Sequence, residues 1–147
     1  MPVATKSQGN MICASTGTVT LDGVVFSKEM SELAVATLTG SERNVHGTGA
    51  SYRFETAQWG GVVLFVAGKI ETVSMVFTPG HAQSLADWSA DDELKRRDEH
   101  IAWIRRWFGP AGIPNRREER VFPWGAVSSE VDHWTGDASL VVSYRAQ

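Results

Sequence analysis

The stretch that decides the fold lies near the end of the sequence, where Phe122-Pro-Trp-Gly-Ala-Val-Ser-Ser-Glu-Val-Asp132 is followed by Ala138-Ser-Leu-Val-Val-Ser-Tyr144. Successive side chains of a strand point to opposite faces. The second part therefore predicts a strand with one strongly apolar face, formed by Ala138, Leu140, Val142 and Tyr144. The first part predicts a partner strand, Ala126–Val131, and the turn residues Thr135-Gly136-Asp137 join the two. We expect this hairpin, Pro123–Tyr144, to lie well inside a β-sheet.

Further strands are predicted upstream of this hairpin. Asp22-Gly23 favours a type I′ turn and joins two short β-prone runs in Thr18–Phe26. Tyr52 and Phe54 alternate with charged residues in a half-buried strand. Two more strands are separated by the turn residues Ala67-Gly68, and they cover Val62–Val66 and Ile70–Phe77.

Two helices are predicted from apolar residues at helical spacing. The first covers Lys28–Thr39, follows Ser27 as its N-cap and ends at Gly40. The second covers Ala90–Phe108 and is stopped by Gly109-Pro110. Its apolar arc at 100° per residue contains Leu94, Ile101, Ile104 and Phe108, whereas Trp103 points to nearly the opposite side.

The predicted order of elements is ββα, βββ, α, ββ, without repeated βαβ units. This order predicts the α+β class, with a single antiparallel sheet of about six to seven strands and two helices packed on one face. We expect residues 1–16 to form a flexible N-terminus and residues 17–147 to form a single domain.

Composition limits the classes of function. The 147 residues carry 14 basic and 17 acidic side chains, a net charge of −3, so no basic field attracts nucleic acid. Cys13 is the only cysteine, which excludes an internal disulfide and a cysteine-based zinc site. No secretory signal or membrane-spanning stretch is recognisable, so we predict a cytoplasmic protein without a membrane partner.

No pattern indicates catalysis, a metal or a cofactor. The four histidines, at positions 46, 81, 100 and 133, lack the spacing of metal ligands, and Gly61–Lys69 lacks the spacing of a phosphate loop. Ser128 and Ser129 lie beside acidic residues and His133, but neighbours in a strand point to opposite faces and cannot form a triad. We therefore predict a non-enzymatic protein.

Six tryptophans are a high number for this length, and tryptophan and arginine are enriched in interface hot spots. Trp103 and Trp134 are the leading candidates for exposed aromatic side chains. The predicted partner-binding residues come from the second helix, the connector after it and the tip of the last hairpin: Arg96, Glu99, Trp103, Arg106, Arg116, Arg117, Asp132, His133, Trp134 and Asp137.

Three segments, Trp103-Ile-Arg-Arg-Trp-Phe-Gly-Pro110, Phe122–Asp132 and Thr135–Tyr144, look like the C-terminal half of small bacterial proteins encoded near secreted toxins. They also resemble immunity proteins of interbacterial polymorphic-toxin systems, including those of type VI secretion. The resemblance implies a cytosolic binding protein that neutralises a cognate toxin domain by covering its active site. It implies no catalytic residue.

Three other functions remain open. A small-ligand-binding domain would enclose an apolar pocket lined by Phe54, Phe65, Met75 and Leu140. An enzyme with a scattered site would bring together some of His46, Glu55, His100 and Asp132 in one cleft. A structural subunit would use its exposed tryptophans for self-association, as a homodimer.

Overall fold

The computed structural model describes residues 10–77, 90–110, 118–131 and 138–144, and these ranges contain ten strands and two helices. The strands are β1 (Asn10–Ile12), β2 (Val19–Leu21), β3 (Val24–Phe26), β4 (Asn44–His46), β5 (Gly49–Glu55), β6 (Trp59–Val66), β7 (Lys69–Phe77), β8 (Arg120–Phe122), β9 (Gly125–Val131) and β10 (Ala138–Ser143). The helices are α1 (Glu32–Thr39) and α2 (Ala90–Phe108). The predicted α+β class is confirmed.

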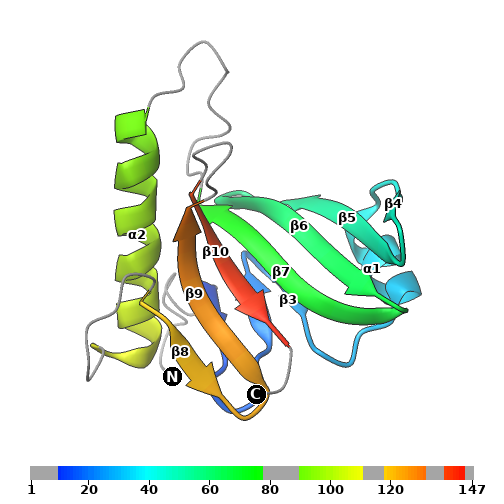
Figure 1. The fold of residues 1–147 in the computed structure, drawn as a ribbon, viewed down its shortest axis with the longest axis horizontal. Helices are drawn as coiled ribbons and strands as arrows, with labels where there is room; N and C mark the ends of the chain where they lie inside the picture. Colours follow the sequence, from blue (N-terminus) through cyan, green and yellow to red (C-terminus); the bar gives the residue numbers. More distant parts are fainter. Residues whose placement is uncertain (1–9, 78–89, 111–117, 132–137, 145–147) are drawn as a thin grey trace, which may run out of the picture.

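The described strands form two antiparallel sheets rather than the single sheet that the sequence predicted. Seven strands pair in the order β4-β5-β6-β7-β10-β9-β8, and β1-β2-β3 form a separate small sheet (Figure 1). Each strand of the small sheet is three residues long, and its fully buried side chains, Val19, Leu21 and Phe26, join the core of the large sheet. The first hairpin therefore covers the large sheet and does not extend it.

The C-terminal hairpin occupies the predicted interior position. Strand β10 lies between β7 and β9, with Leu140 opposite Met75 on one side and Ser129 on the other. Ala138, Leu140 and Val142 are at most 1% exposed, and Tyr144 packs against the core. The apolar face predicted from alternation is confirmed, because a strand with neighbours on both sides can bury one complete face.

The N-terminal turn and the start of the chain show one agreement and one difference. Asp22 and Gly23 both have positive φ, 49° and 87°, as the predicted type I′ turn requires. Strand β1, however, lies within the first 16 residues, which the sequence predicted to be flexible. The indole N–H groups of Trp107 and Trp124 donate to the main-chain oxygens of Asn10 and Ala14, and these bonds hold this segment on the domain.

Helix α1 begins four residues later than predicted. Ser31, not Ser27, is the N-cap, since its Oγ accepts the N–H of Ala34 at 3.1 Å. Gly40 ends the helix in the left-handed conformation, with φ 63°. The predicted bounds of α2, Ala90–Phe108, are confirmed.

The side of α2 that faces the sheet differs from the predicted arc. Leu94 is 46% exposed, whereas Trp103 is 8% exposed and His100 is fully buried. Glu93 is buried as well, and its carboxylate accepts the N–H of Ala138 at 2.9 Å. A prediction from hydropathy places glutamate and histidine on the solvent side of a helix. It therefore misses the buried side of α2, where Glu93 and His100 each accept a main-chain hydrogen bond.

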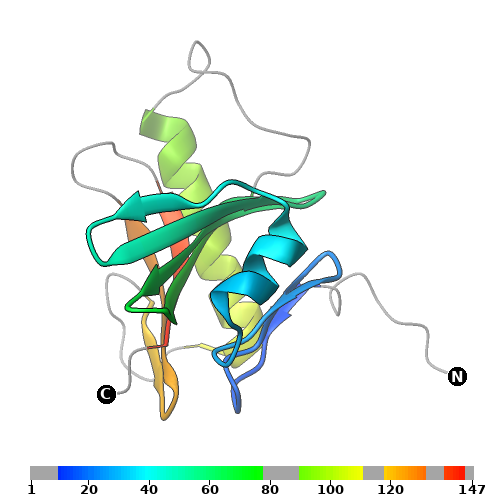
Figure 2. The same ribbon diagram turned by 90° about the vertical axis from the view of Figure 1, so that its right-hand side faces the viewer.

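Both helices and the small sheet cover the same face of the large sheet (Figure 2). Val35 of α1 and Ile104 of α2 belong to one hydrophobic core together with the small-sheet residues. Trp59 lies at the centre of the α2 side of this core, with its ring 5.0 Å from Phe77 and 5.6 Å from Trp103. The core therefore occupies one side of the large sheet, and no described helix covers the other side.

Candidate partner-binding groove

The predicted contact surface on α2 is only partly exposed. Trp103 packs against Trp59 and Phe77, and the guanidinium of Arg106 lies 4.4 Å from its ring centre. The prediction that Trp103 is exposed is therefore wrong. The aromatic cluster of the core supplies the second surface that this indole needs, and the exposed Arg106 side chain stacks on the ring.

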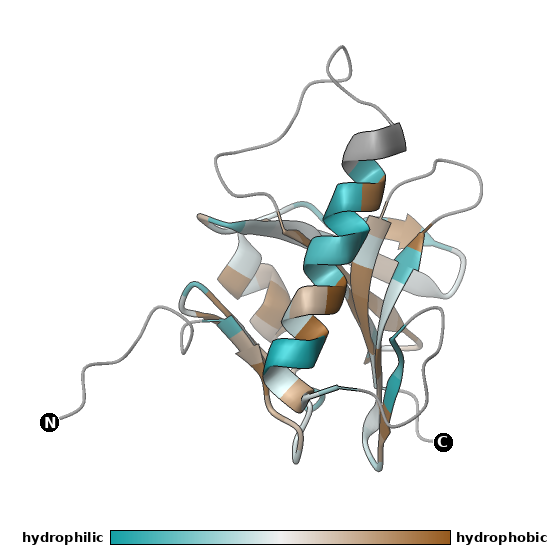
Figure 3. Cartoon of the chain, turned by 90° about the vertical axis from the view of Figure 1, so that its left-hand side faces the viewer, coloured by the Kyte–Doolittle hydropathy of each residue, from teal (hydrophilic) through white to brown (hydrophobic). Residues whose placement is uncertain are grey.

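The other predicted residues of α2 differ in exposure. Arg96 is half-buried and pairs with the buried carboxylate of Glu93, while Glu99 is exposed. The outward side of α2 is mainly hydrophilic (Figure 3). The remaining predicted contact residues lie outside the described ranges: Arg116, Arg117, Asp132, His133, Trp134 and Asp137. The predicted contact surface on the described part of α2 therefore has exposed charged side chains but no exposed aromatic side chain.

Two residues of the proposed scattered enzyme site, His100 and His46, lie on opposite faces of the large sheet. His100 lies on the core face of the large sheet, where its Nε2 accepts the main-chain N–H of Phe77 at 3.0 Å. His46 lies on the opposite face and hydrogen-bonds Ser51. Asp132 is outside the described ranges, and among the described residues no group of three His, Cys, Asp or Glu side chains could hold a metal.

Stability should depend on the pH through His100. Burial, with a smaller contribution from Arg96, lowers the pKa of His100 from 6.5 to about 4. The unfolded chain therefore binds a proton between these pH values that the folded chain does not bind. We expect stability to be complete above pH 6.5 and to fall by up to about 3 kcal/mol as the pH drops towards 4.

Urea unfolding at a series of pH values measures this loss. His100→Gln removes the titrating group and keeps an oxygen that can accept the Phe77 N–H, so the difference between wild type and variant isolates His100 from the carboxylates. His46→Gln, at an exposed position, is the control. Parallel stability curves for wild type and His100→Gln would contradict the assignment.

The pocket predicted for an apolar ligand is part of the core. Phe54, Phe65, Met75 and Leu140 are all buried within one hydrophobic cluster. Phe54, for example, packs against Phe26 of the small sheet, with ring centroids 4.9 Å apart. These residues therefore stabilise the fold.

An apolar groove lies between α1 and β3. It has a volume of about 730 Å³ and is lined without any charged side chain by Gly23, Val25, Met30, Ser31, Leu33, Ala34, Thr37 and Leu38. Leu33 is 77% exposed, and Val25 and Leu38 are each 43% exposed. An exposed, uncharged groove of this kind is typical of a surface that meets another apolar surface.

Helix α1 has apolar residues on its buried and on its exposed side. Val35 is fully buried, whereas Leu33 and Leu38 face solvent, and Glu32 is the only charged residue of the helix. A helix without a polar side is normally enclosed by protein. The helical spacing of these residues predicts the helix but carries no information on which of its sides is covered.

The edge of β3 adds hydrogen-bonding groups to this groove. In the order β1-β2-β3, β3 pairs with β2 and with no other strand of the described ranges. Leu21 and Val24 flank the two-residue turn and form a hydrogen-bonded pair. Because hydrogen-bonded and non-hydrogen-bonded pairs alternate along an antiparallel ladder, the N–H and C=O of the next residue, Val25, point away from β2. The side chain of Val25 lines the groove, so apolar contacts and strand-type hydrogen bonds are offered at one place.

Comparison of the chain with protein-family models, with curated proteins and with solved structures finds no match. None of the helices in the described ranges is long and apolar enough to span a membrane. The resemblance to immunity proteins stays a prediction.

Proposed function

We propose that this chain is a non-catalytic protein-binding domain that holds an extended, apolar segment of its partner in the groove between α1 and β3. The observation that carries the proposal is the exposure of Leu33, 77%, in a groove without charged side chains. A partner strand beside Val25 would form main-chain hydrogen bonds, and its alternate side chains would enter the groove.

The chemistry of the groove favours a protein partner that contributes apolar side chains. Burying an exposed leucine contributes about 1.5–3 kcal/mol, and several such contacts at the centre of an interface supply most of its binding energy. The lining is uncharged, so affinity should depend little on salt. The net charge of −3 adds modest steering towards a basic partner.

Within this class we propose an immunity protein that acts in the cytoplasm of the producing cell. The partner would be a cognate toxin domain, which the bound chain inhibits by covering its active site. The C-terminal segments that resemble immunity proteins support this partner, and the groove supports the mode of contact. Arg106 and Glu99, exposed on α2, would contribute to the rim of a larger interface.

Leu33→Asp should weaken the complex with the toxin domain at least tenfold, because it places a charge in an apolar contact. Leu94→Asp is the matched control, since Leu94 is also exposed, at 46%, but lies on α2 outside the groove lining. The measurement is co-purification with the toxin encoded beside this gene, followed by calorimetric titration.

Three outcomes would count against the proposal. If the wild type forms no complex at micromolar concentration, the immunity function is contradicted, because such inhibitors bind far more tightly. If Leu94→Asp and Leu33→Asp weaken binding equally, the groove is not the contact. If light scattering finds a homodimer that Leu33→Asp dissociates, a second copy of this chain occupies the groove instead.

A further inference from the structure

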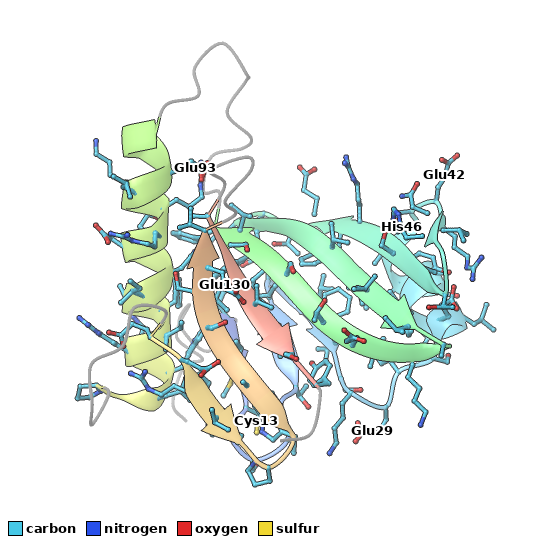
Figure 4. All side chains as sticks on the ribbon, in the orientation of Figure 1. Cys13, Glu29, Glu42, His46, Glu93 and Glu130 are labelled. Carbon is cyan, nitrogen blue, oxygen red and sulfur yellow. The ribbon has the colours of Figure 1, made fainter. Side chains whose placement is uncertain are left out.

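A second, polar pocket lies on the face of the large sheet that no described helix covers. Its volume is about 740 Å³, and its polar lining comes from Ser41, Glu42, Asn44, His46, Ser51 and Arg53. Figure 4 labels His46 and Glu42 at the β4 end of this sheet, away from the labelled Glu93 and Glu130. The pocket shares no lining residue with the groove between α1 and β3.

Strand pairing brings these side chains together. Asn44 of β4 lies opposite Ser51 of β5, and Arg53 is two residues further along β5, so all three point to the same face. The core residues Tyr52 and Phe54 alternate with them and point to the other face. The polar lining is therefore fixed by the register that builds the core.

Ser51 and His46 are hydrogen-bonded to each other in the pocket. Ser51 is 8% exposed, and its Oγ lies 3.1 Å from Nε2 of His46. When the imidazole donates its Nε2 proton to this oxygen, the hydroxyl proton of Ser51 is free to donate to a ligand. The amide of Asn44 supplies further donors beside it.

Arg53 supplies the positive charge. Its guanidinium makes no ion pair or hydrogen bond with the residues of the described ranges, although it lines the same pocket. A planar guanidinium binds phosphate and carboxylate through two parallel N–H donors, which gives geometry as well as charge. An arginine beside an oriented hydroxyl and an amide is a suitable arrangement for an oxyanion.

We propose that this pocket binds the phosphate or carboxylate group of a small polar ligand, with Arg53 as the bidentate contact and Ser51 and Asn44 as neutral donors. Glu42, exposed at the rim, opposes an anion and should limit the affinity. Removing the charge of Arg53 should therefore weaken anion binding, whereas removing the charge of Glu42 should strengthen it. This site is independent of the proposed partner-binding groove.

The test is a titration of ¹⁵N-labelled full-length protein with inorganic phosphate at constant ionic strength, followed by the amide shifts of Ser51 and Arg53. We expect saturable shifts in the wild type. Arg53→Gln should weaken binding at least tenfold, and Glu42→Gln should strengthen it about two- to threefold. A parallel titration with acetate determines whether the site prefers a tetrahedral or a planar oxyanion.

Arg53→Lys keeps the charge and removes the bidentate geometry, so it should bind with intermediate affinity and should fold even if Arg53→Gln does not. If neither anion gives saturable shifts in the wild type, the proposal is overturned. Equal binding by wild type, Arg53→Lys and Arg53→Gln would also overturn it, because the shifts would then report a general ionic effect. Leu33→Asp is expected to leave phosphate binding unchanged.

Discussion

Replacing Gly125 with alanine should destabilise the domain by on the order of 4 kcal/mol, close to the whole stability of a marginal protein. Gly125 has φ 152°, a conformation that residues with a Cβ rarely adopt. A Cβ atom at this position would lie 1.8 Å from the main-chain oxygen of Ser143. Because Ser143 ends β10, the substitution pushes apart the two strands of the C-terminal hairpin.

Gly109→Ala is the matched control for this substitution. Gly109 also has positive φ, 80°, but an added Cβ would meet nothing within 4 Å. It should therefore cost only the conformational strain, about 1 kcal/mol. Urea unfolding followed by circular dichroism measures both variants. Equal losses of stability would show that strain, and not contact with Ser143, determines the effect of Gly125→Ala.

Local patterns were sufficient for much of the fold. The Asp22-Gly23 turn, the bounds of α2 and the buried face of β10 depend on neighbouring residues, and all three were predicted from the sequence. The side of α2 that faces the sheet was not predicted, because it depends on hydrogen bonds to residues far away in the sequence. Glu93 bonds the N–H of Ala138, 45 residues away, and His100 bonds that of Phe77, 23 residues away.

The candidate site was harder to predict than the fold. Leu33 and Leu38 have the spacing of core residues, and the sequence does not show that α1 is covered on one side only. Trp103 had the charged neighbours of an exposed residue, but the aromatic cluster around Trp59 encloses it. One feature of the sequence did indicate the groove: α1 has no charged residue after Glu32, which is unusual for a short helix with an exposed side.

Trp59→Ala should destabilise the domain by about 3–5 kcal/mol, the range for a large aromatic side chain removed from a core. Trp59 is fully buried, and its ring meets Phe77, His100, Trp103 and Trp107. The cavity left by an alanine would lie between β6 and α2, and the rigid strands around it could not close it. Urea unfolding gives the loss, with Trp59→Phe as the variant that keeps an aromatic ring.

The same substitution should loosen the small sheet that forms one wall of the groove. The indole N–H of Trp59 donates to Oδ1 of Asn10 at 3.1 Å, and this oxygen also accepts the N–H of Asp22. The bond therefore ties β1 and the turn before β3 to the core of the large sheet. Both Trp59→Ala and Trp59→Phe remove it, so hydrogen exchange at β1–β3 should accelerate in both variants, whereas the large loss of stability is confined to alanine. Unchanged exchange in Trp59→Phe would mean that the other contacts of the small sheet, among them the packing of Val19, Leu21 and Phe26 and the bond from Trp107 to Asn10, are sufficient to hold it, and that the groove does not depend on the Trp59 bond.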